Sequence, residues 1–313
     1  RLLTGHSRPA PPPEPPTIMR RWLLAALLAA PARAALSCVD EDGSPVDWWF
    51  LYKQPRWADK GRQEPVGNGE GDTYVYASSA RNYEWKVGAT VVNSSTCLLG
   101  KNLEGIYDGT VENFVLYNDQ LPNGSWTRDF GHSKGWFAWD GDGAMWVQHS
   151  IPKFPATKAE GYSYPRDPEP GDDGYDFGAG QMWYGQHAFC MSLTPAQLND
   201  AAGAMLYAHP WVYDWAQGAA SDDDDGAATL PNVSAVIGGE SKEGSITTAI
   251  TAGWGELTLY GKSASLGEDM LNSLISPTLD ETLDSQALAA APPPRPPRSY
   301  RPHLPRLTPH LLP

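Results

Sequence analysis

The chain has 313 residues, which is long enough to bury one substantial core or two small ones. Asp and Glu number 37 against 23 Lys and Arg, which gives a formal net charge of −14 at pH 7. Between Cys38 and Ser285 the imbalance is steeper, with 14 basic against 36 acidic residues. This argues against a nucleic-acid binder that works at neutral pH, because such proteins normally present a basic face. The objection weakens in an acidic compartment, where carboxylates begin to take up protons and histidines become charged.

Residues 19–34 predict a secretory signal peptide. Met19 is followed by two arginines, a short apolar block over 22–30 and a small-residue site at 32–34. The apolar block is too short to span a membrane. We therefore expect translation to begin at Met19, residues 1–18 to be an upstream extension, and the mature chain to begin near Ala35. The alternative is that the apolar block forms an N-terminal helix of the fold.

Further features fit the secretory pathway. Asn-x-Ser sequons at Asn93, Asn123 and Asn232 are candidate glycosylation sites on exposed loops. The three cysteines, at positions 38, 97 and 190, show neither a CxxC motif nor zinc-like spacing. In an oxidising compartment this number predicts one disulfide and one remaining thiol, and no metal site is expected.

The first half of the domain is rich in predicted strands. Aromatic and β-branched runs bounded by turn residues predict strands over 46–52, 72–76, 113–119, 136–139 and 144–150. The last two flank an Asp-Gly turn over 140–143 and predict a hairpin. That acidic turn lacks the ligand pattern of a calcium loop, with Ile151 standing where a bidentate Glu is needed. Residues 56–72 and 156–180 are predicted loops.

Helices enter in the second half. A strand over 189–193 leads into a helix from Thr194, a predicted N-cap before Pro195, to about Tyr207. Residues 247–260 predict two strands around Gly253, and 269–275 predict a further helix. Asp222 to Asp225 is a solvated acidic run in a loop. After about Ser285 the chain becomes Pro/Arg-rich without an acidic residue, so residues 286–313 are either a disordered basic tail or an aberrant reading frame.

One tripeptide carries chemistry. In Gly131-His132-Ser133-Lys134-Gly135, an extended backbone would place the imidazole and the ammonium on one face of a strand. A nucleophile or proton carrier beside a fixed cation suits attack on a phosphodiester, whose developing negative charge needs a nearby positive group. The motif alone is weak, because strand histidines are usually only hydrogen-bonded. The sequence contains no GxxxxGK[ST] motif, which excludes a phosphate loop of that type.

Ordered blocks around this tripeptide resemble the deoxyribonuclease II family. They are Cys38-Val39-Asp40 with Gly43-x-Pro45-Val46-Asp47-Trp48-Trp49 and Tyr52-Lys53-x-Pro55, Leu116-Tyr117-Asn118-Asp119-Gln120, Gly131-His132-Ser133-Lys134-Gly135, Asp142-Gly143-x-x-Trp146 with His149-Ser150-x-Pro152-x-Phe154-Pro155, Tyr184-Gly185-Gln186, Cys190-x-Ser192, Pro210-Trp211-Val212-Tyr213, and the weaker Lys262 to Leu271 stretch. The resemblance covers residues 38 to about 283, so we interpret 35–285 as one deoxyribonuclease II-like domain.

The resemblance implies a fold and a site. The fold would be of the α/β (α+β) class and phospholipase D-like, with a mixed sheet between helices and two pseudo-repeated halves, the second incomplete. It implies His132 and Lys134 as catalytic residues, with His149 supporting the site, and a disulfide between Cys38 and Cys190. Cys97 would then be unpaired or paired elsewhere.

The resemblance also implies an activity. This is metal-independent, cofactor-free cleavage of DNA in acid by a secreted or lysosomal enzyme that is free of the membrane once the signal peptide is removed. One histidine attacks phosphorus to form a phosphohistidine, and a partner histidine protonates the leaving 5′ oxygen, so the products carry 3′-phosphate ends. The two imidazoles would act in opposite protonation states, while lysines hold the phosphate oxygens.

The sequence departs from this pattern in one respect. Each half of such a protein supplies one His-x-Lys motif, yet of the seven histidines only His132 is followed two residues later by lysine. We therefore keep three alternatives: an endodeoxyribonuclease, a secreted non-catalytic relative that binds nucleic acid or glycan, and a chain whose single motif pairs with that of another copy. His187 and His209 are expected to be structural, and the oligomeric state is left open.

Overall fold

The computed structural model describes residues 35–56, 69–165, 181–182, 184–218 and 230–279. The predictions for the signal peptide, the acidic run over 222–225 and the Pro/Arg-rich tail lie outside these residues. The chain separates into two compact units, residues 1–266 and 267–313. No helix in the described part of the chain is long and apolar enough to cross a bilayer.

The first unit contains most of the regular structure. Its strands are β1 (Trp48–Lys53), β2 (Tyr74–Ser78), β3 (Lys86–Val87), β4 (Asn113–Asn118), β5 (Lys134–Trp139), β6 (Ala144–His149), β7 (Gln186–Leu193), β8 (Val212–Ala216), β9 (Ser245–Ala252) and β10 (Gly255–Lys262). Its helices are α2 (Leu98–Asp108), α3 (Pro195–Ala208) and α4 (Pro231–Ile237), with short 3₁₀ turns η1 (Ser79–Arg81) and η2 (Ala264–Leu266). The described part of the second unit is helical, with a π-helical turn η3 (Leu271–Ile275) and α5 (Ser276–Leu279).

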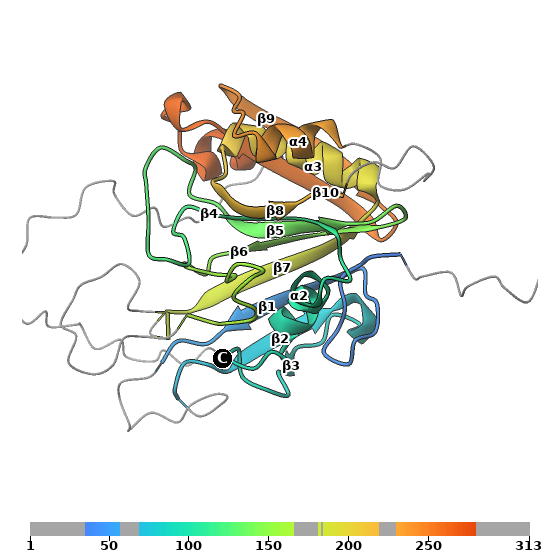
Figure 1. The fold of residues 1–313 in the computed structure, drawn as a ribbon. Helices are drawn as coiled ribbons and strands as arrows, with labels where there is room; N and C mark the ends of the chain where they lie inside the picture. The colour runs from blue at the N-terminus through green and yellow to red at the C-terminus, as the bar shows by residue number, and fades with distance from the viewer. Residues whose placement is uncertain (1–34, 57–68, 166–180, 183, 219–229, 280–313) are drawn as a thin grey trace, which may run out of the picture. The chain divides into compact units, whose positions relative to one another are not determined.

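The strands β1 to β8 form one sheet in the order β3-β2-β1-β7-β6-β5-β4-β8, and β9 and β10 form a separate hairpin (Figure 1). Every described pairing is antiparallel. The α+β class is therefore confirmed, whereas the expectation of a mixed sheet is wrong in this part of the chain. Strands β5 and β6, for example, follow each other through the short turn over 140–143, and such a connection joins antiparallel strands.

Each face of the sheet has its own core. Helix α2 covers one face, where Leu99, Leu103 and Ile106 pack against sheet residues such as Trp49 and Trp136. Helices α3 and α4 and the β9–β10 hairpin cover the other face (Figure 1), where Val115 and Phe137 meet Leu198, Met205 and Val233. Helix α2 was not predicted from the sequence, because two glycines interrupt its segment and lower its helix propensity.

The predicted start of the long helix is confirmed. The Thr194 hydroxyl accepts a hydrogen bond from the Gln197 N–H at 3.2 Å, and the Gln197 side chain accepts from the Thr194 N–H at 2.8 Å. This reciprocal pair is a capping box, and Pro195 occupies the first helical position. The helix ends at His209, which adopts a left-handed backbone with φ of 49°.

The predicted hairpin also forms, as β5 and β6. Its acidic turn is held by Asp140, whose carboxylate accepts hydrogen bonds from the backbone N–H groups of Asp142 and Gly143 at 3.0 and 2.7 Å. The other oxygen accepts from the Leu36 N–H at 3.1 Å. The turn therefore uses its first aspartate to fix backbone, including the start of the described chain.

A disulfide joins Cys38 to Cys190, the pairing that the resemblance implied, across 152 residues of sequence. Such a link typically stabilises a domain by about 2–5 kcal/mol, mainly by restricting the unfolded chain. Cys97 carries a free, buried thiol that lies 3.1 Å from the Tyr162 hydroxyl, and burial raises its pKa.

Candidate active site

The tripeptide lies at the start of β5, next to the end of β4. Asn118 at the end of β4 pairs with Lys134 at the start of β5, so the next residue, Asp119, lies beside the segment that leads into β5. The Asp119 carboxylate accepts a hydrogen bond from His132 Nδ1 at 2.7 Å through one oxygen and an ion-pair hydrogen bond from Lys134 Nζ through the other. One carboxylate therefore holds both side chains of the motif.

The structure corrects how His132 and Lys134 come together. Only Lys134 belongs to the strand, while His132 lies in a bend before it, where the Ser133 N–H bonds to the Gly131 carbonyl at 2.8 Å. The period-two argument is therefore wrong for His132. The two side chains meet because both bind Asp119.

The three groups differ sharply in exposure. The side chains of Lys134 and Asp119 are 3% and 10% exposed, whereas the His132 imidazole is 83% exposed. Burial by itself raises the pKa of the Asp119 carboxyl, but the hydrogen bonds from His132 and Lys134 outweigh it and hold that pKa below its ordinary value. Burial also lowers the pKa of the Lys134 ammonium, an effect that Asp119 opposes. The cluster is thus a buried ion pair with an imidazole extending into solvent.

The contact with Asp119 fixes the tautomer of His132. An ionised carboxylate can only accept hydrogen bonds, so Nδ1 carries the proton and donates it. In the neutral ring the lone pair is then on Nε2, the nitrogen that faces away from Asp119. A histidine oriented by a carboxylate in this way can act as a nucleophile or as a proton acceptor.

Close packing of glycine backbones seats the motif. A Cβ atom at Gly131 would collide with the Ala208 carbonyl oxygen, and one at Gly135 would collide with Val147 and the Tyr117 hydroxyl. The Gly131 N–H also donates to the His209 carbonyl at 2.9 Å, which ties the bend to the end of α3. The two glycines that flank His-Ser-Lys are therefore required by the packing at this corner.

Asn118 fixes the strand end that carries Asp119. Its side-chain amide donates to the carbonyls of Ile151 and Phe154 at 3.1 and 2.8 Å, and its side-chain oxygen accepts from the Gln120 N–H at 2.9 Å. These bonds hold the backbone on both sides of Asp119. The carboxylate is thereby positioned before any ligand arrives, which is the arrangement that favours catalysis.

His149, the third predicted site residue, lies at the end of β6 and is buried at 6% exposure. Its ring packs against Trp136 and Phe154, and Nδ1 accepts from the Ile151 N–H at 3.1 Å. Nε2 is buried without a hydrogen-bond partner among the described residues. Burial, with smaller contributions from the charges of Lys134 and His187, holds the pKa of His149 well below its ordinary value. His149 is therefore a neutral imidazole near Lys134, and it does not touch Asp119.

The other described histidines have structural contacts. His187 stacks on Phe50 with ring centroids 6.2 Å apart, and burial lowers its pKa. His209 caps α3, and its ring lies 4.6 Å from that of Phe130. In the described residues no group of three or more His, Cys, Asp or Glu side chains could hold a metal ion.

The predicted glycosylation sites differ in accessibility. Asn123 is exposed at the tip of the β4–β5 loop. The Asn232 amide nitrogen donates to the Asn199 carbonyl at 2.9 Å, so this amide is already bound within the fold. Asn93 is partly exposed, and its side-chain oxygen is buried.

Sequence reasoning missed Asp119 as a site residue. The available signal was its place directly after a buried strand, within the block Leu116 to Gln120 that carried part of the resemblance. A carboxylate at a strand end cannot be matched to a motif 13 residues away until the pairing of the two strands is known.

Comparison with known proteins places this geometry in context. The family model described as Deoxyribonuclease II matches residues 37–294. The chain is 35% identical to Deoxyribonuclease-2-alpha of Mus musculus over 202 residues. These aligned residues make up 63% of this chain and 52% of the mouse protein. It is 30% identical over 274 residues to Deoxyribonuclease-2-alpha of Bos taurus, covering 84% of this chain and 68% of the bovine protein. Deoxyribonuclease-2-beta of Rattus norvegicus is 32% identical over 196 residues, which cover 61% of this chain and 50% of the rat protein. The chain thus spans about half to two thirds of the length of these relatives.

Proposed function

Since the chain belongs to the deoxyribonuclease II family, we propose that it cleaves DNA phosphodiester bonds in an acidic compartment, with His132 as the nucleophile. The observation that carries this proposal is the Asp119 carboxylate shared by His132 and Lys134. This carboxylate fixes the tautomer of the exposed His132 imidazole and also pairs with the buried Lys134 ammonium.

The proposed reaction begins at His132 Nε2. This nitrogen attacks the phosphorus, a nitrogen–phosphorus bond forms, and the bond from phosphorus to the 5′ oxygen breaks. The leaving oxygen takes a proton from a general acid. Water then hydrolyses the phosphohistidine, which releases a 3′-phosphate end and restores the imidazole.

Asp119 and Lys134 support this step from behind the ring. As the ring attacks phosphorus it gains positive charge, which the adjacent carboxylate stabilises. Because the pKa of Asp119 lies below 3.8, this carboxylate stays ionised at about pH 5. The Lys134 ammonium is already bound to one oxygen of the Asp119 carboxylate. This bond makes Asp119 a weaker base toward His132. No step of this scheme uses a metal ion.

The proposed setting is the secretory pathway, with a lysosomal or secreted destination. The Cys38–Cys190 disulfide supports an oxidising compartment, because such bonds are rare where thiols are kept reduced. The excess of acidic side chains also fits DNA better at low pH, where partial protonation reduces repulsion from the phosphates.

One observation favours a second candidate, DNA binding without cleavage. His132 is the one histidine of this sequence with lysine two residues later, so the general acid cannot come from a second His-x-Lys motif of this sequence. A chain that lacks an effective proton donor would bind the phosphodiester without completing the reaction. This candidate predicts binding at pH about 5 that leaves the DNA intact.

Nicking of supercoiled plasmid at pH about 5 in the presence of EDTA tests the proposal. We expect nicking by the full chain to persist in EDTA, to leave 3′-phosphate ends, and to be lost in His132→Ala. The matched control is His209→Ala, which removes a histidine that contacts neither Asp119 nor Lys134. Binding without nicking would establish the second candidate, and nicking abolished by EDTA would overturn the metal-free mechanism.

A further inference from the structure

The loop between β4 and β5 carries an aromatic side chain and a cation directly before His132. Trp126 is 58% exposed, and the Arg128 guanidinium carbon lies 5.7 Å from the centre of its ring. An exposed tryptophan under an arginine is an unusual surface for a chain with so many acidic residues, and exposed aromatic surface often marks a binding site. The two side chains form what we call the Trp126–Arg128 pair.

Arg128 has no carboxylate partner in the described residues, unlike the other two described arginines. Arg56 pairs with Glu70 at 3.2 Å, and Arg81 pairs with Asp40 at 3.1 Å. The neighbouring Asp129 carboxylate accepts a hydrogen bond from the Thr127 hydroxyl at 3.0 Å and forms no ion pair with Arg128 among the described residues. The guanidinium therefore keeps its hydrogen-bond donors available for an external anion.

The backbone under the pair is held in place on both sides. Trp126 forms an isolated β-bridge with Gln120, and the Leu121 N–H donates to the Ser125 carbonyl at 2.8 Å. After the pair, Phe130 stacks on Trp211 with centroids 5.4 Å apart, and Gly131 is bonded to His209. The pair is thus presented on a fixed loop, which lowers the entropy lost when a ligand binds.

The position of the loop fits a polymer that passes over His132. Arg128 precedes His132 by four residues, so their Cα atoms are at most about 14 Å apart. Arg128 can therefore contact a phosphate of the same strand within a few nucleotides of the one at His132.

We propose that the Trp126–Arg128 pair is a subsite for one strand of the DNA substrate, in which Arg128 binds a phosphate and Trp126 stacks on an unpaired base. This rests on the proposed function, since it takes DNA as the ligand. Guanidinium groups bind phosphate in a planar fork, and aromatic rings stack on bases with little sequence preference. The subsite supplies a cation and a stacking ring in a chain whose formal net charge is −14 at pH 7.

Binding of a labelled single-stranded 12-mer at pH about 5, measured by fluorescence anisotropy in the His132→Ala background of the full chain, tests the subsite without cleavage. We expect Trp126→Ala to weaken binding by about 5- to 150-fold and Trp126→Tyr to restore most of it. Arg128→Ala should weaken binding and reduce the slope of log affinity against log salt by about 0.7.

Two matched controls make the result specific. Trp85→Ala removes a tryptophan of nearly the same exposure, 59%, next to β3, and Lys242→Ala removes a cation that lies 5.9 Å from the Tyr207 ring. Both should bind like the parent. If Trp126→Ala and Arg128→Ala also bind like the parent, the subsite is wrong while the proposed function stands. If the His132→Ala chain does not bind the 12-mer and the unsubstituted chain does not nick plasmid, the proposed function fails together with the subsite.

Discussion

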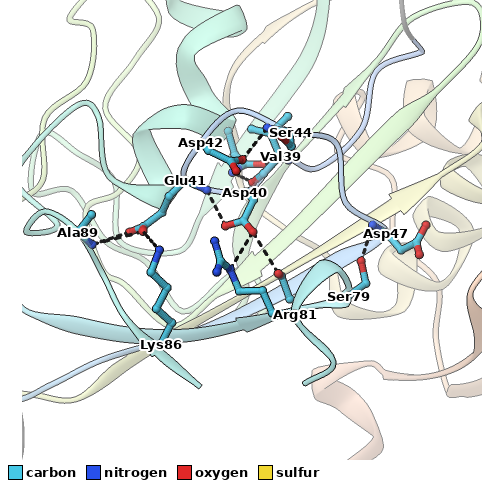
Figure 2. Close-up of polar contacts among 12 residues, drawn as sticks. Val39, Asp40, Glu41, Asp42, Ser44, Asp47, Ser79, Arg81, Lys86 and Ala89 are labelled. Atoms are coloured by element: carbon cyan, nitrogen blue, oxygen red, sulfur yellow. Dashed lines mark hydrogen bonds and ion pairs between the residues drawn. The ribbon is translucent and has the colours of Figure 1, made fainter. Parts of the chain in front are cut away.

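Two buried aspartates in this chain bind cations and serve different purposes. Asp40, before β1, accepts hydrogen bonds from the Glu41 N–H at 2.7 Å and from Arg81 Nε at 3.1 Å (Figure 2). It also accepts one from the Ser78 hydroxyl at 3.3 Å. Its partners lie in the N-terminal segment, at the end of β2 and in the 3₁₀ turn η1. Asp40 is 2% exposed, and its bonds tie the start of the domain to one end of the sheet.

Asp119 also binds two side chains, His132 and Lys134, but the His132 ring is exposed to solvent. Lys134 is as buried as the carboxylate, whereas His132 is 83% exposed and uses one of its two ring nitrogens for the contact. At Asp40 the hydrogen bonds to Glu41, Ser78 and Arg81 all connect parts of the fold to each other. The comparison teaches that a buried carboxylate indicates a functional site when it orients a side chain that is exposed to solvent. It indicates a structural role when all of its hydrogen-bond partners belong to the packed interior or to the backbone beside it.

The largest expected effect comes from removing the charge at Asp119. In Asp119→Asn, His132 loses the anion that fixes its tautomer and stabilises its developing charge, so we expect the cleavage rate per folded molecule to fall by about 10²- to 10⁴-fold. Single-turnover nicking assays corrected for the folded fraction measure this. A variant that cleaves at the parental rate would reduce Asp119 to a structural role like that of Asp40.

The reverse result is expected at Asp40. In Asp40→Asn, loss of the charge facing Arg81 should lower the free energy of unfolding by about 1–3 kcal/mol and leave cleavage per folded molecule unchanged. Urea denaturation gives the stability, and the same nicking assay gives the rate. The control is Asp42→Asn, two residues away on the exposed turn, which should destabilise less. Loss of cleavage in folded Asp40→Asn would mean that the two regions are coupled.

His149 sharpens the comparison through pH. Its folded pKa lies well below 6.5, so as the pH falls below 6.5 the unfolded chain takes up a proton before the folded one. The stability associated with neutral His149 is present above pH 6.5 and is lost as the pH falls toward the folded pKa, by up to about 1.4 kcal/mol per pH unit.

His149→Asn, which keeps an acceptor for the Ile151 N–H, should flatten this slope. Chemical denaturation at intervals between pH 7 and pH 5 measures the difference between variant and parent. The same slope in both proteins would show that His149 is protonated in the fold, contrary to its burial.

The smallest effect is expected at the edge of the Asp40 region. Lys86 is 42% exposed and lies 3.7 Å from Glu41 (Figure 2), so Lys86→Ala should change the free energy of unfolding by less than about 0.5 kcal/mol. Denaturation at low and at high salt checks this. A loss above 1 kcal/mol would mean that the ion pair contributes to the fold as much as the buried contacts of Asp40.

Local signals in the sequence identified much of the architecture. The strands β1, β4, β5 and β6 and the capped start of α3 were predictable, because alternation, turn residues and caps act over a few neighbouring positions. Helix α2, β8 and α4 were not predicted. Helix α2 carries two glycines and α4 begins with a proline, and packing against the sheet holds both helices in place. Strand β8 is held at the sheet edge by pairing with β4.

For the site, the sequence by itself determined that His132 and Lys134 lie in one short motif, and that this motif belongs to a recognisable series of blocks. The tertiary structure alone decided that Asp119 joins them, that Lys134 is buried while His132 is exposed, and that His149 is a neutral ring in the core. The physical reason is that protonation, tautomer and exposure depend on groups brought close by strand pairing, and a linear pattern does not record which distant residues become neighbours.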